Sequence, residues 1–208
     1  RARGMQRGDR VAILAEVRGD WARVDLAALA ARLPTVGIYP STRPDQVEHI
    51  LRHSGARLLV VDSAHRLETL APVLRGLPAL EAVLLMDPLP EVAPDLGCPL
   101  ESLAALVEAG VVRLAQEEEA VLAEAHGAGP DDLATLVYTS GTTGEPKGAM
   151  LSQRNLFSVS ETVASLLDFG PADRSIVYLP LAHILQRYTL YLGMRVGSQG
   201  WYLGEIPR

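Results

Sequence analysis

The sequence has little cysteine, few aromatic residues and no excess of positive charge, and each shortage narrows the classes of protein that it can encode. Cys98 is the only cysteine, so no disulfide can form within the chain, and a cysteine-based metal site is disfavoured. We interpret Cys98 as a packing residue without chemistry. The net charge of −6 argues against nucleic-acid binding, a function that calls for a basic face.

Long apolar runs are also missing, since none reaches the roughly 18 residues that a membrane span needs. Aromatic residues make up 5% of the chain and hydrophobic residues 48%, which predicts a core of Ala, Leu and Val. The single cysteine indicates a reducing compartment, so we expect a cytoplasmic protein. Peripheral contact with the inner face of a membrane stays open. The chain opens without an initiator methionine, and we expect it to be internal to a longer protein.

Short apolar runs alternate with segments in which apolar residues recur at helical spacing. The apolar runs predict strands at 10–17, 35–40, 57–62, 80–87, 132–140 and 173–180. The helical spacing predicts helices at 20–32, 44–55, 64–74, 101–126, 153–170 and 181–193, with Ser63 and Ser152 as N-terminal caps. This alternation is typical of an α/β fold with a parallel sheet and helices on both faces.

The stretch YTSGTTGEPKG, residues 138–148, coincides with the end of the strand predicted at 132–140. Its glycines permit close approach of a ligand, and successive backbone N–H groups there can form an anion-binding concavity. Its hydroxyl groups add hydrogen-bond donors, and Lys147 adds a positive charge, so the combination favours a polyphosphate. It is not a Walker A loop, because Pro146 precedes Lys147 and Gly148 follows it. A flexible hairpin with incidental hydroxyl groups is the alternative interpretation.

The order of residues in YTSGTTGEPKGAMLSQRN resembles the signature loop of the adenylate-forming superfamily, which includes acyl-CoA synthetases, luciferases and peptide-synthetase adenylation domains. Two further stretches, GDRVAILAEVRGDWARVDLAALA and YPSTRPDQVEHILRHSGARLLVVD, resemble early segments of the same superfamily. YLPLAHILQR resembles the Leu-Pro-[Leu/Met]-[Ala/Ser]-His segment of long-chain fatty acyl-CoA synthetases. The resemblance covers nearly the whole chain. Gln186 departs from it, since the long-chain branch usually reads Glu-Arg at this place.

This resemblance implies both a fold and an activity. Residues 1–208 would be part of the large N-terminal domain, with a first α/β sub-region at 1–126, a phosphate-loop sub-region at 127–208 and the C-terminal domain absent. The activity would be that of a long-chain fatty acid–CoA ligase, which uses ATP, Mg²⁺ and coenzyme A to convert a fatty acid to acyl-AMP and then acyl-CoA. The family's adenine-binding segment and catalytic lysine are not found, so we expect a fragment or partial chain.

Other functions stay open. The chain could activate another carboxylic acid, or be a nucleotide-binding remnant without turnover, or be a plain α/β interaction domain. A fatty acid and coenzyme A are the expected partners, nucleic acid is not expected, and a homodimer is left open.

The resemblance also implies roles for single residues. The phosphate loop would comprise Thr139, Ser140, Gly141, Thr142, Thr143, Gly144 and Lys147. Of these, Thr142, Thr143 and Lys147 would be catalytic, because they would stabilise charge on the departing pyrophosphate. His183 would line the substrate pocket, and a structural role near the start of the predicted apolar helix is the alternative.

Several residues near these positions are interpreted as structural. Tyr138 would pack beneath the loop, and Arg187 would be tied to an acidic partner. No metal-binding residue is predicted, because the remaining histidines lack metal-ligand spacing and read as scattered surface residues: His49, His53, His65 and His126.

Overall fold

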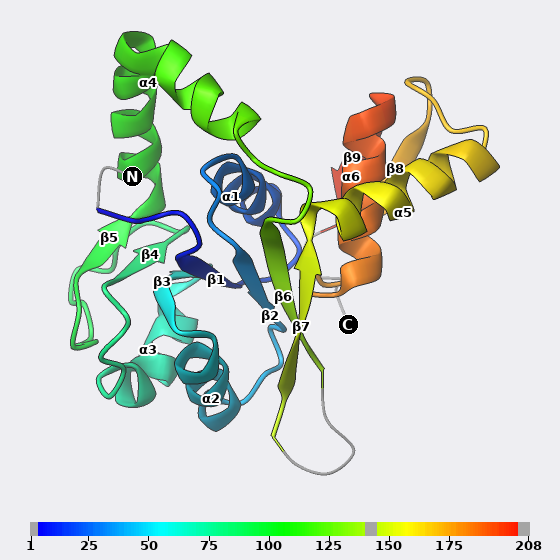
Figure 1. The fold of residues 1–208 in the computed structure, drawn as a ribbon. Coiled ribbons are helices and arrows are strands. Elements are labelled where there is room, and N and C mark those ends of the chain that lie inside the picture. The colour runs from blue at the N-terminus through cyan, green and yellow to red at the C-terminus, as the bar shows by residue number, and fades with distance from the viewer. Residues whose placement is uncertain (1–3, 140–144, 204–208) are drawn as a thin grey trace.

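The computed structural model describes residues 4–139 and 145–203, which form nine strands and six helices (Figure 1). The strands are β1 (Arg10–Leu14), β2 (Thr35–Ile38), β3 (Ala56–Val61), β4 (Ala82–Leu85), β5 (Leu100–Ser102), β6 (Leu133–Thr139), β7 (Lys147–Ser152), β8 (Arg174–Val177) and β9 (Gln199–Tyr202). The helices are α1 (Gly19–Ala30), α2 (Pro44–Ser54), α3 (Ala64–Leu74), α4 (Leu103–His126), α5 (Gln153–Leu166) and α6 (Ile184–Val196).

The main sheet has seven strands in the order β5-β4-β3-β1-β2-β6-β7. Every neighbouring pair is parallel except β6 and β7, which are antiparallel. A separate parallel pair, β8 and β9, lies beside α5 and α6 (Figure 1). Strand order therefore reverses at β1, because the chain adds β2 on one side of it and β3 on the other.

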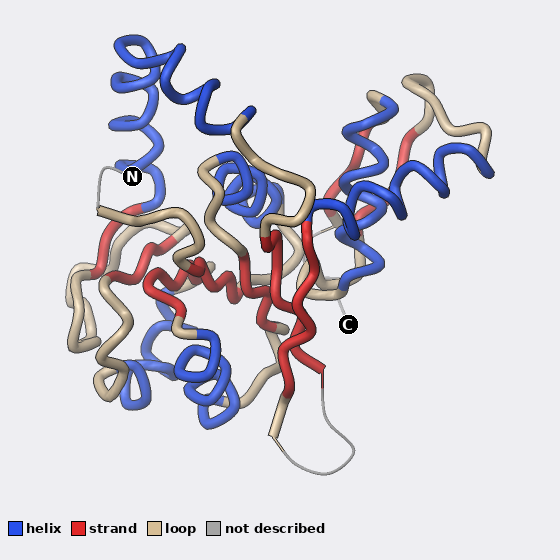
Figure 2. The backbone as a smooth tube through the Cα atoms, viewed as in Figure 1, coloured by secondary structure: helices blue, strands red, loops and turns tan. Residues whose placement is uncertain are grey.

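Helices cover both faces of the main sheet (Figure 2). Alternate strand residues such as Leu14, Val61 and Leu85 pack in one cluster with the buried sides of α2 and α3. The residues between them, such as Ile13 and Val60, pack in a second cluster with α1 and the start of α4. A strand buried on both faces reads as a continuous apolar run, which is why the sequence pattern predicted these strands. The predicted α/β class is confirmed.

The helix ends follow local rules that the sequence already shows. Pro44 begins α2, and Gly55 ends it in the left-handed conformation with φ 61°. The Ser63 hydroxyl accepts a hydrogen bond from the Arg66 backbone N–H and caps α3. Ser152 likewise caps α5 in a capping box with Asn155, so both predicted caps are confirmed.

The structure differs from the prediction at three strands. β5 occupies the first residues of the helix predicted at 101–126, and β9 was not predicted at all. β7 pairs antiparallel with β6, so the sheet is not wholly parallel. The sequence does not reveal these strands because they are short or partly exposed. Their buried and exposed positions do not alternate, so apolar and polar residues do not alternate along the sequence either.

A buried polar cluster fixes α6 against the main sheet. Arg187 on α6 and Asp25 on α1 are both 0% exposed, and the guanidinium Nη2 donates to Asp25 Oδ1 at 2.6 Å. Arg187 also donates to Thr135 Oγ1 on β6 at 2.6 Å and to Thr35 Oγ1 on β2 at 2.9 Å. The Tyr191 hydroxyl donates to the other Asp25 oxygen at 2.6 Å. The predicted acidic partner of Arg187 is therefore Asp25.

The first prediction concerns this cluster. Replacing Arg187 with Met should lower the free energy of unfolding by about 3–5 kcal/mol, because Asp25 is left charged and buried without its partner. Urea denaturation monitored by circular dichroism measures the change. The matched control is Arg154→Met, which breaks an exposed pair with Asp131 and should cost less than about 1 kcal/mol. Equal effects of the two substitutions would contradict this account.

Candidate functional site

The ends of the predicted phosphate loop lie opposite each other on a β-hairpin. Thr139 is the last residue of β6 and pairs with Lys147, the first residue of β7. The residues between them that were predicted to bind phosphate lie outside the described residues, namely Ser140, Gly141, Thr142, Thr143 and Gly144. Because β6 runs parallel to β2 and β1, Thr139 lies at the carboxyl edge of the sheet. Ligands of open α/β sheets bind at this edge.

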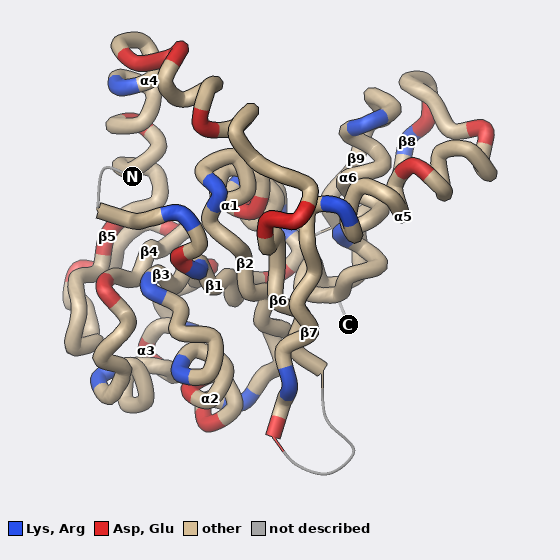
Figure 3. The backbone as a smooth tube through the Cα atoms, in the orientation of Figure 1, with Lys and Arg blue, Asp and Glu red and all other residues tan. Residues whose placement is uncertain are grey.

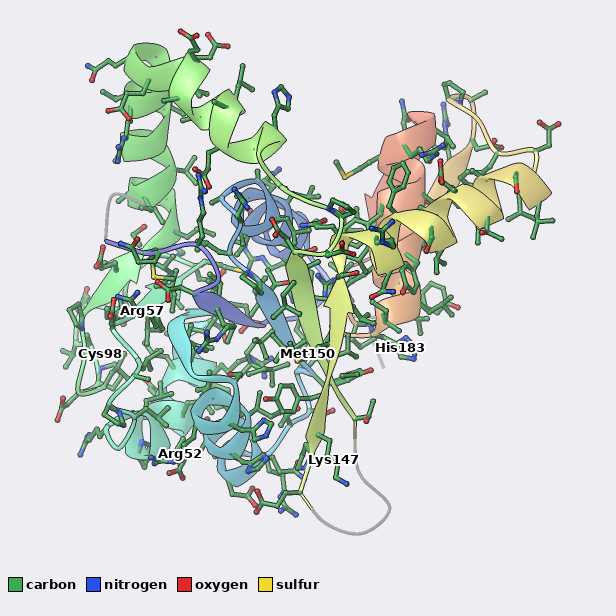
Figure 4. All side chains as sticks on the ribbon, in the orientation of Figure 1. Arg52, Arg57, Cys98, Lys147, Met150 and His183 are labelled. Atoms are coloured by element: carbon green, nitrogen blue, oxygen red, sulfur yellow. The ribbon has the colours of Figure 1, made fainter. Side chains whose placement is uncertain are left out.

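Lys147 is exposed at the base of the loop, and Figure 4 shows its side chain leaving β7. It is the only lysine in the chain. Among the described residues its ammonium group has no hydrogen bond and no ion pair, whereas most of the arginines have a carboxylate partner. An unpaired ammonium beside a loop rich in backbone donors can bind an anion without first breaking an internal interaction.

The Tyr138 side chain packs against the β7 strand of the hairpin. Its side chain is 5% exposed, and its ring lies so close to Gly148 that a Cβ there would sit 3.0 Å from the ring Cζ. Burial raises the pKa of the Tyr138 hydroxyl, which forms a hydrogen bond of 2.7 Å with His53 Nδ1. Its burial agrees with the prediction that Tyr138 is a packing residue.

His183 lies at the carboxyl edge near β2. It is the N-terminal cap of α6, where its Nδ1 accepts a hydrogen bond from the Leu185 backbone N–H at 3.2 Å. Its ring meets Tyr39, the residue after β2, edge-on at 6.4 Å between centroids. Since Nδ1 is an acceptor, the neutral ring carries its proton on Nε2. The exposed ring can therefore donate a hydrogen bond to a carboxylate.

Gln186 has a structural function that the sequence did not reveal. Its Oε1 accepts hydrogen bonds from the backbone N–H groups of Tyr178 and Leu179, at 3.3 and 3.1 Å. Its amide nitrogen donates to Thr189 Oγ1 at 2.6 Å. The side chain thus fixes the segment that leads from β8 to His183. Glutamate, which the resemblance suggested here, offers the same acceptor oxygens.

The prediction of scattered histidines is wrong for one pair. His49 and His53 on α2 stack with ring centroids 5.5 Å apart and planes 16° apart. His49 is half-buried and contacts Glu145 and the Pro146 carbonyl oxygen, which lie just before β7. The signal in the sequence is their spacing of four residues, which puts two side chains on one face of a helix.

A crevice separate from the hairpin lies at the carboxyl ends of β1 and β3, where strand order reverses. It has a volume of about 570 Å³ and is lined by charged residues including Glu16, Arg18, Asp62, Arg66 and Asp87. Arg18 and Arg66 each pair with two carboxylates, so neither guanidinium group is left as a free charge for a ligand. No single sequence motif marks this crevice, because its lining residues follow four different strands, β1 to β4.

The acid–base behaviour of the crevice gives the second prediction. Burial alone would raise the pKa of Asp62, but hydrogen bonds from the Arg66 guanidinium and the Glu16 backbone N–H lower it below the usual range. A carboxyl with a lower pKa in the folded state adds stability above its unfolded pKa, and this is lost as the pH falls through its folded pKa.

The free energy of unfolding should therefore differ most between the native chain and Asp62→Asn at neutral pH. The difference should narrow as the pH falls below about 4, the ordinary pKa of an aspartate. Urea denaturation at pH 7, 4 and 3 measures it, with Asp131→Asn as the exposed control. A difference that stays constant with pH would contradict the role assigned to Asp62.

The contact between Gly148 and Tyr138 gives the third prediction. Gly148→Ala should lower the free energy of unfolding by about 1–3 kcal/mol, because the new methyl group overlaps the buried ring. The matched control is Gly110→Ala in α4, where a Cβ meets no atom within 4 Å. That change should raise stability by about 0.4–1 kcal/mol. Denaturant titration compares them, and a harmless Gly148→Ala would contradict the packing described above.

In residues 4–139 and 145–203, no group of three histidine, cysteine, aspartate or glutamate side chains is placed to hold a metal ion. Within the same part of the chain, no helix combines the length and the apolar character that a bilayer crossing requires. Figure 3 shows basic and acidic residues interspersed along the chain.

Comparison with solved structures shows which fold the chain adopts. The anthranilate CoA ligase AuaEII in complex with anthranoyl-AMP superposes with a TM-score of 0.78 at 19% identity, covering 99% of this chain and 37% of that one. Apo MatB from Rhodopseudomonas palustris gives a TM-score of 0.71 at 24% identity, again covering 99% of this chain and 37% of that one. The fold is that of the N-terminal domains of adenylate-forming enzymes.

Residues 1–208 match the family described as AMP-binding enzyme, and the chain belongs to this family. The predicted resemblance is confirmed. Fatty acyl-CoA synthetase A of Dictyostelium discoideum is 31% identical over 98% of this chain and 30% of its own length. Long-chain-fatty-acid–CoA ligase FadD15 of Mycobacterium bovis is 38% identical over 88% of this chain and 29% of its own length. The chain thus spans about 30% of the length of these relatives.

Proposed function

We propose that this chain supplies the phosphate-binding part of an ATP-dependent fatty acid–CoA ligase. The observation that carries the proposal is the geometry of the hairpin: Lys147, the only lysine, is unpaired among the described residues and lies directly opposite Thr139. The relatives with 31% and 38% identity, which are a fatty acyl-CoA synthetase and a long-chain ligase, support fatty acids as the substrate class.

The proposed reaction has two steps. First, a carboxylate oxygen of the fatty acid bonds to the α-phosphorus of ATP, the α–β phosphoanhydride bond breaks, and pyrophosphate leaves with the electron pair. Second, the thiol sulfur of coenzyme A bonds to the acyl carbon, its proton is lost, and AMP leaves. The first step activates a carboxylate, which would otherwise have to expel an oxide ion.

The residues of this chain would act chiefly in the first step. Negative charge grows on the departing pyrophosphate, and fixed donors around it lower the barrier. We assign this role to Lys147, Thr142 and Thr143, with Thr139 and the backbone of Ser140–Gly144 holding the phosphates. Mg²⁺ would enter with ATP, since phosphate oxygens are its preferred ligands, and would neutralise part of the same charge.

His183 would orient the fatty acid. Its Nδ1 is held by the Leu185 backbone N–H, which leaves Nε2–H as a fixed donor at the carboxyl edge of the sheet. A hydrogen bond from Nε2 to the substrate carboxylate would direct the other carboxylate oxygen toward the phosphate. Contact with the inner face of a membrane and a homodimer stay predictions.

Chemical labelling tests the phosphate site directly and gives the fourth prediction. An amine-reactive ester acylates the unprotonated side-chain amine of Lys147 and the N-terminal amine of the purified chain, and its alcohol leaves; the N-terminal amine serves as an internal control. Mg·ATP at ten times its dissociation constant should slow labelling of Lys147 about tenfold and leave the N-terminal amine unchanged. Peptide mass spectrometry measures both rates. Thr143→Ala should weaken the protection, and equal labelling with and without nucleotide would overturn the proposed site.

Carboxylate-dependent exchange between ATP and pyrophosphate tests the reaction itself, with acids from acetate to palmitate. Exchange should rise with acid length and fall about 10²- to 10³-fold in Lys147→Ala and Thr143→Ala. Arg113→Ala, which removes an exposed charge on α4, is the control and should not change it. Nucleotide protection without exchange would identify a binding remnant. Exchange that peaks with another acid would identify a different substrate.

A further inference from the structure

We propose that His49 and His53, the α2 histidine pair, are positioning residues that hold the two ends of the phosphate-loop hairpin in register. The proposal rests on the function proposed above, because it gives that hairpin the task of binding nucleotide. Neither histidine is assigned contact with a substrate. They act on the residues that flank the loop: Tyr138 on β6, and Glu145 and Pro146 before β7.

His49 is tied to the β7 side of the hairpin by both ring nitrogens. Its Nε2 lies 3.1 Å from the Pro146 carbonyl oxygen, and its Nδ1 contacts the Glu145 carboxylate. Both partners are hydrogen-bond acceptors. The ring therefore joins α2 to the two residues that precede β7, with one nitrogen toward each of them.

His53 is tied to the β6 side. Its Nδ1 forms the 2.7 Å hydrogen bond with the Tyr138 hydroxyl, and its ring meets the Tyr138 ring at 86° with centroids 5.8 Å apart. Tyr138 is in turn packed against Gly148, the cross-strand partner of Tyr138 on β7. His49 and His53 also stack on each other, so one turn of α2 contacts both the β6 side and the β7 side of the hairpin.

These contacts restrict the backbone conformation at Lys147. It follows Pro146, whose ring restricts φ, so fixing the Pro146 carbonyl restricts the backbone from which the lysine side chain extends. A cation held near its working position loses less freedom when a phosphate binds, and its affinity for the phosphate is correspondingly higher. The α2 histidine pair would therefore raise nucleotide affinity through Lys147, without touching the nucleotide.

The structural half of the proposal is tested by amide hydrogen exchange. In His49→Ala and His53→Ala, the amides of β7 should exchange about fivefold faster, the effect expected from losing one net hydrogen bond. Tyr138→Phe removes only the hydroxyl and should reproduce the His53→Ala effect, with no further change in the double variant. His126→Ala, at the exposed end of α4, is the matched control. Unchanged exchange at β7 in both histidine variants would overturn the proposal.

The functional half is tested by calorimetric titration of the same variants with Mg·ATP. His49→Ala should weaken binding about fivefold, while His49→Gln, which retains one donor for Pro146, should weaken it less. A merely structural role would change the melting temperature and leave the dissociation constant as in the native chain, and that result would overturn the positioning role. If the native chain itself fails to bind Mg·ATP, the proposed function fails, while the exchange experiment still decides whether the histidines hold the hairpin.

Discussion

The buried ion pair between Arg187 and Asp25 is the interaction on which the rest of the arrangement depends. Two charges without solvent are tolerable only when every donor and acceptor is satisfied, and here Thr35, Thr135 and Tyr191 complete the set. These side chains come from α1, β2, β6 and α6. The satisfied cluster therefore fixes α6 against the two strands whose carboxyl ends border the candidate site.

This cluster ties α6 directly to α1, β2 and β6. His183 caps the start of α6, and β6 ends at Thr139, so one buried cluster sets the position of His183 relative to Thr139, the two ends of the proposed site. The hairpin then has its own supports, namely the Tyr138 ring beneath Gly148 and the two histidines of α2. A two-stranded hairpin is marginally stable by itself, so contacts from outside the hairpin stabilise it.

Strands buried on both faces and capped helices were predictable from the sequence, because each has a local signature in composition or period. The glycines, hydroxyl groups and lysine of the loop could likewise be read directly from YTSGTTGEPKG. The rest depends on contacts between distant residues. Asp25 lies 162 residues before Arg187, and His49 lies 97 residues before Pro146, so no window of sequence contains either pair. β7 went unrecognised because half-exposed residues on an edge strand show no alternation.

The distribution of charge shows how an acidic chain could offer the proposed site for a polyphosphate. Several arginines are already ion-paired within the protein. Arg18, Arg57 and Arg66 each contact two carboxylates, which neutralise the positive charge of the guanidinium group. Lys147 is left without such a partner among the described residues, and the nearby carboxylate of Glu145 is engaged by His49 instead. If His49 were lost, the Glu145 carboxylate would be free to approach the lysine. Local pairing, more than the net charge of −6, therefore decides whether this hairpin attracts phosphate.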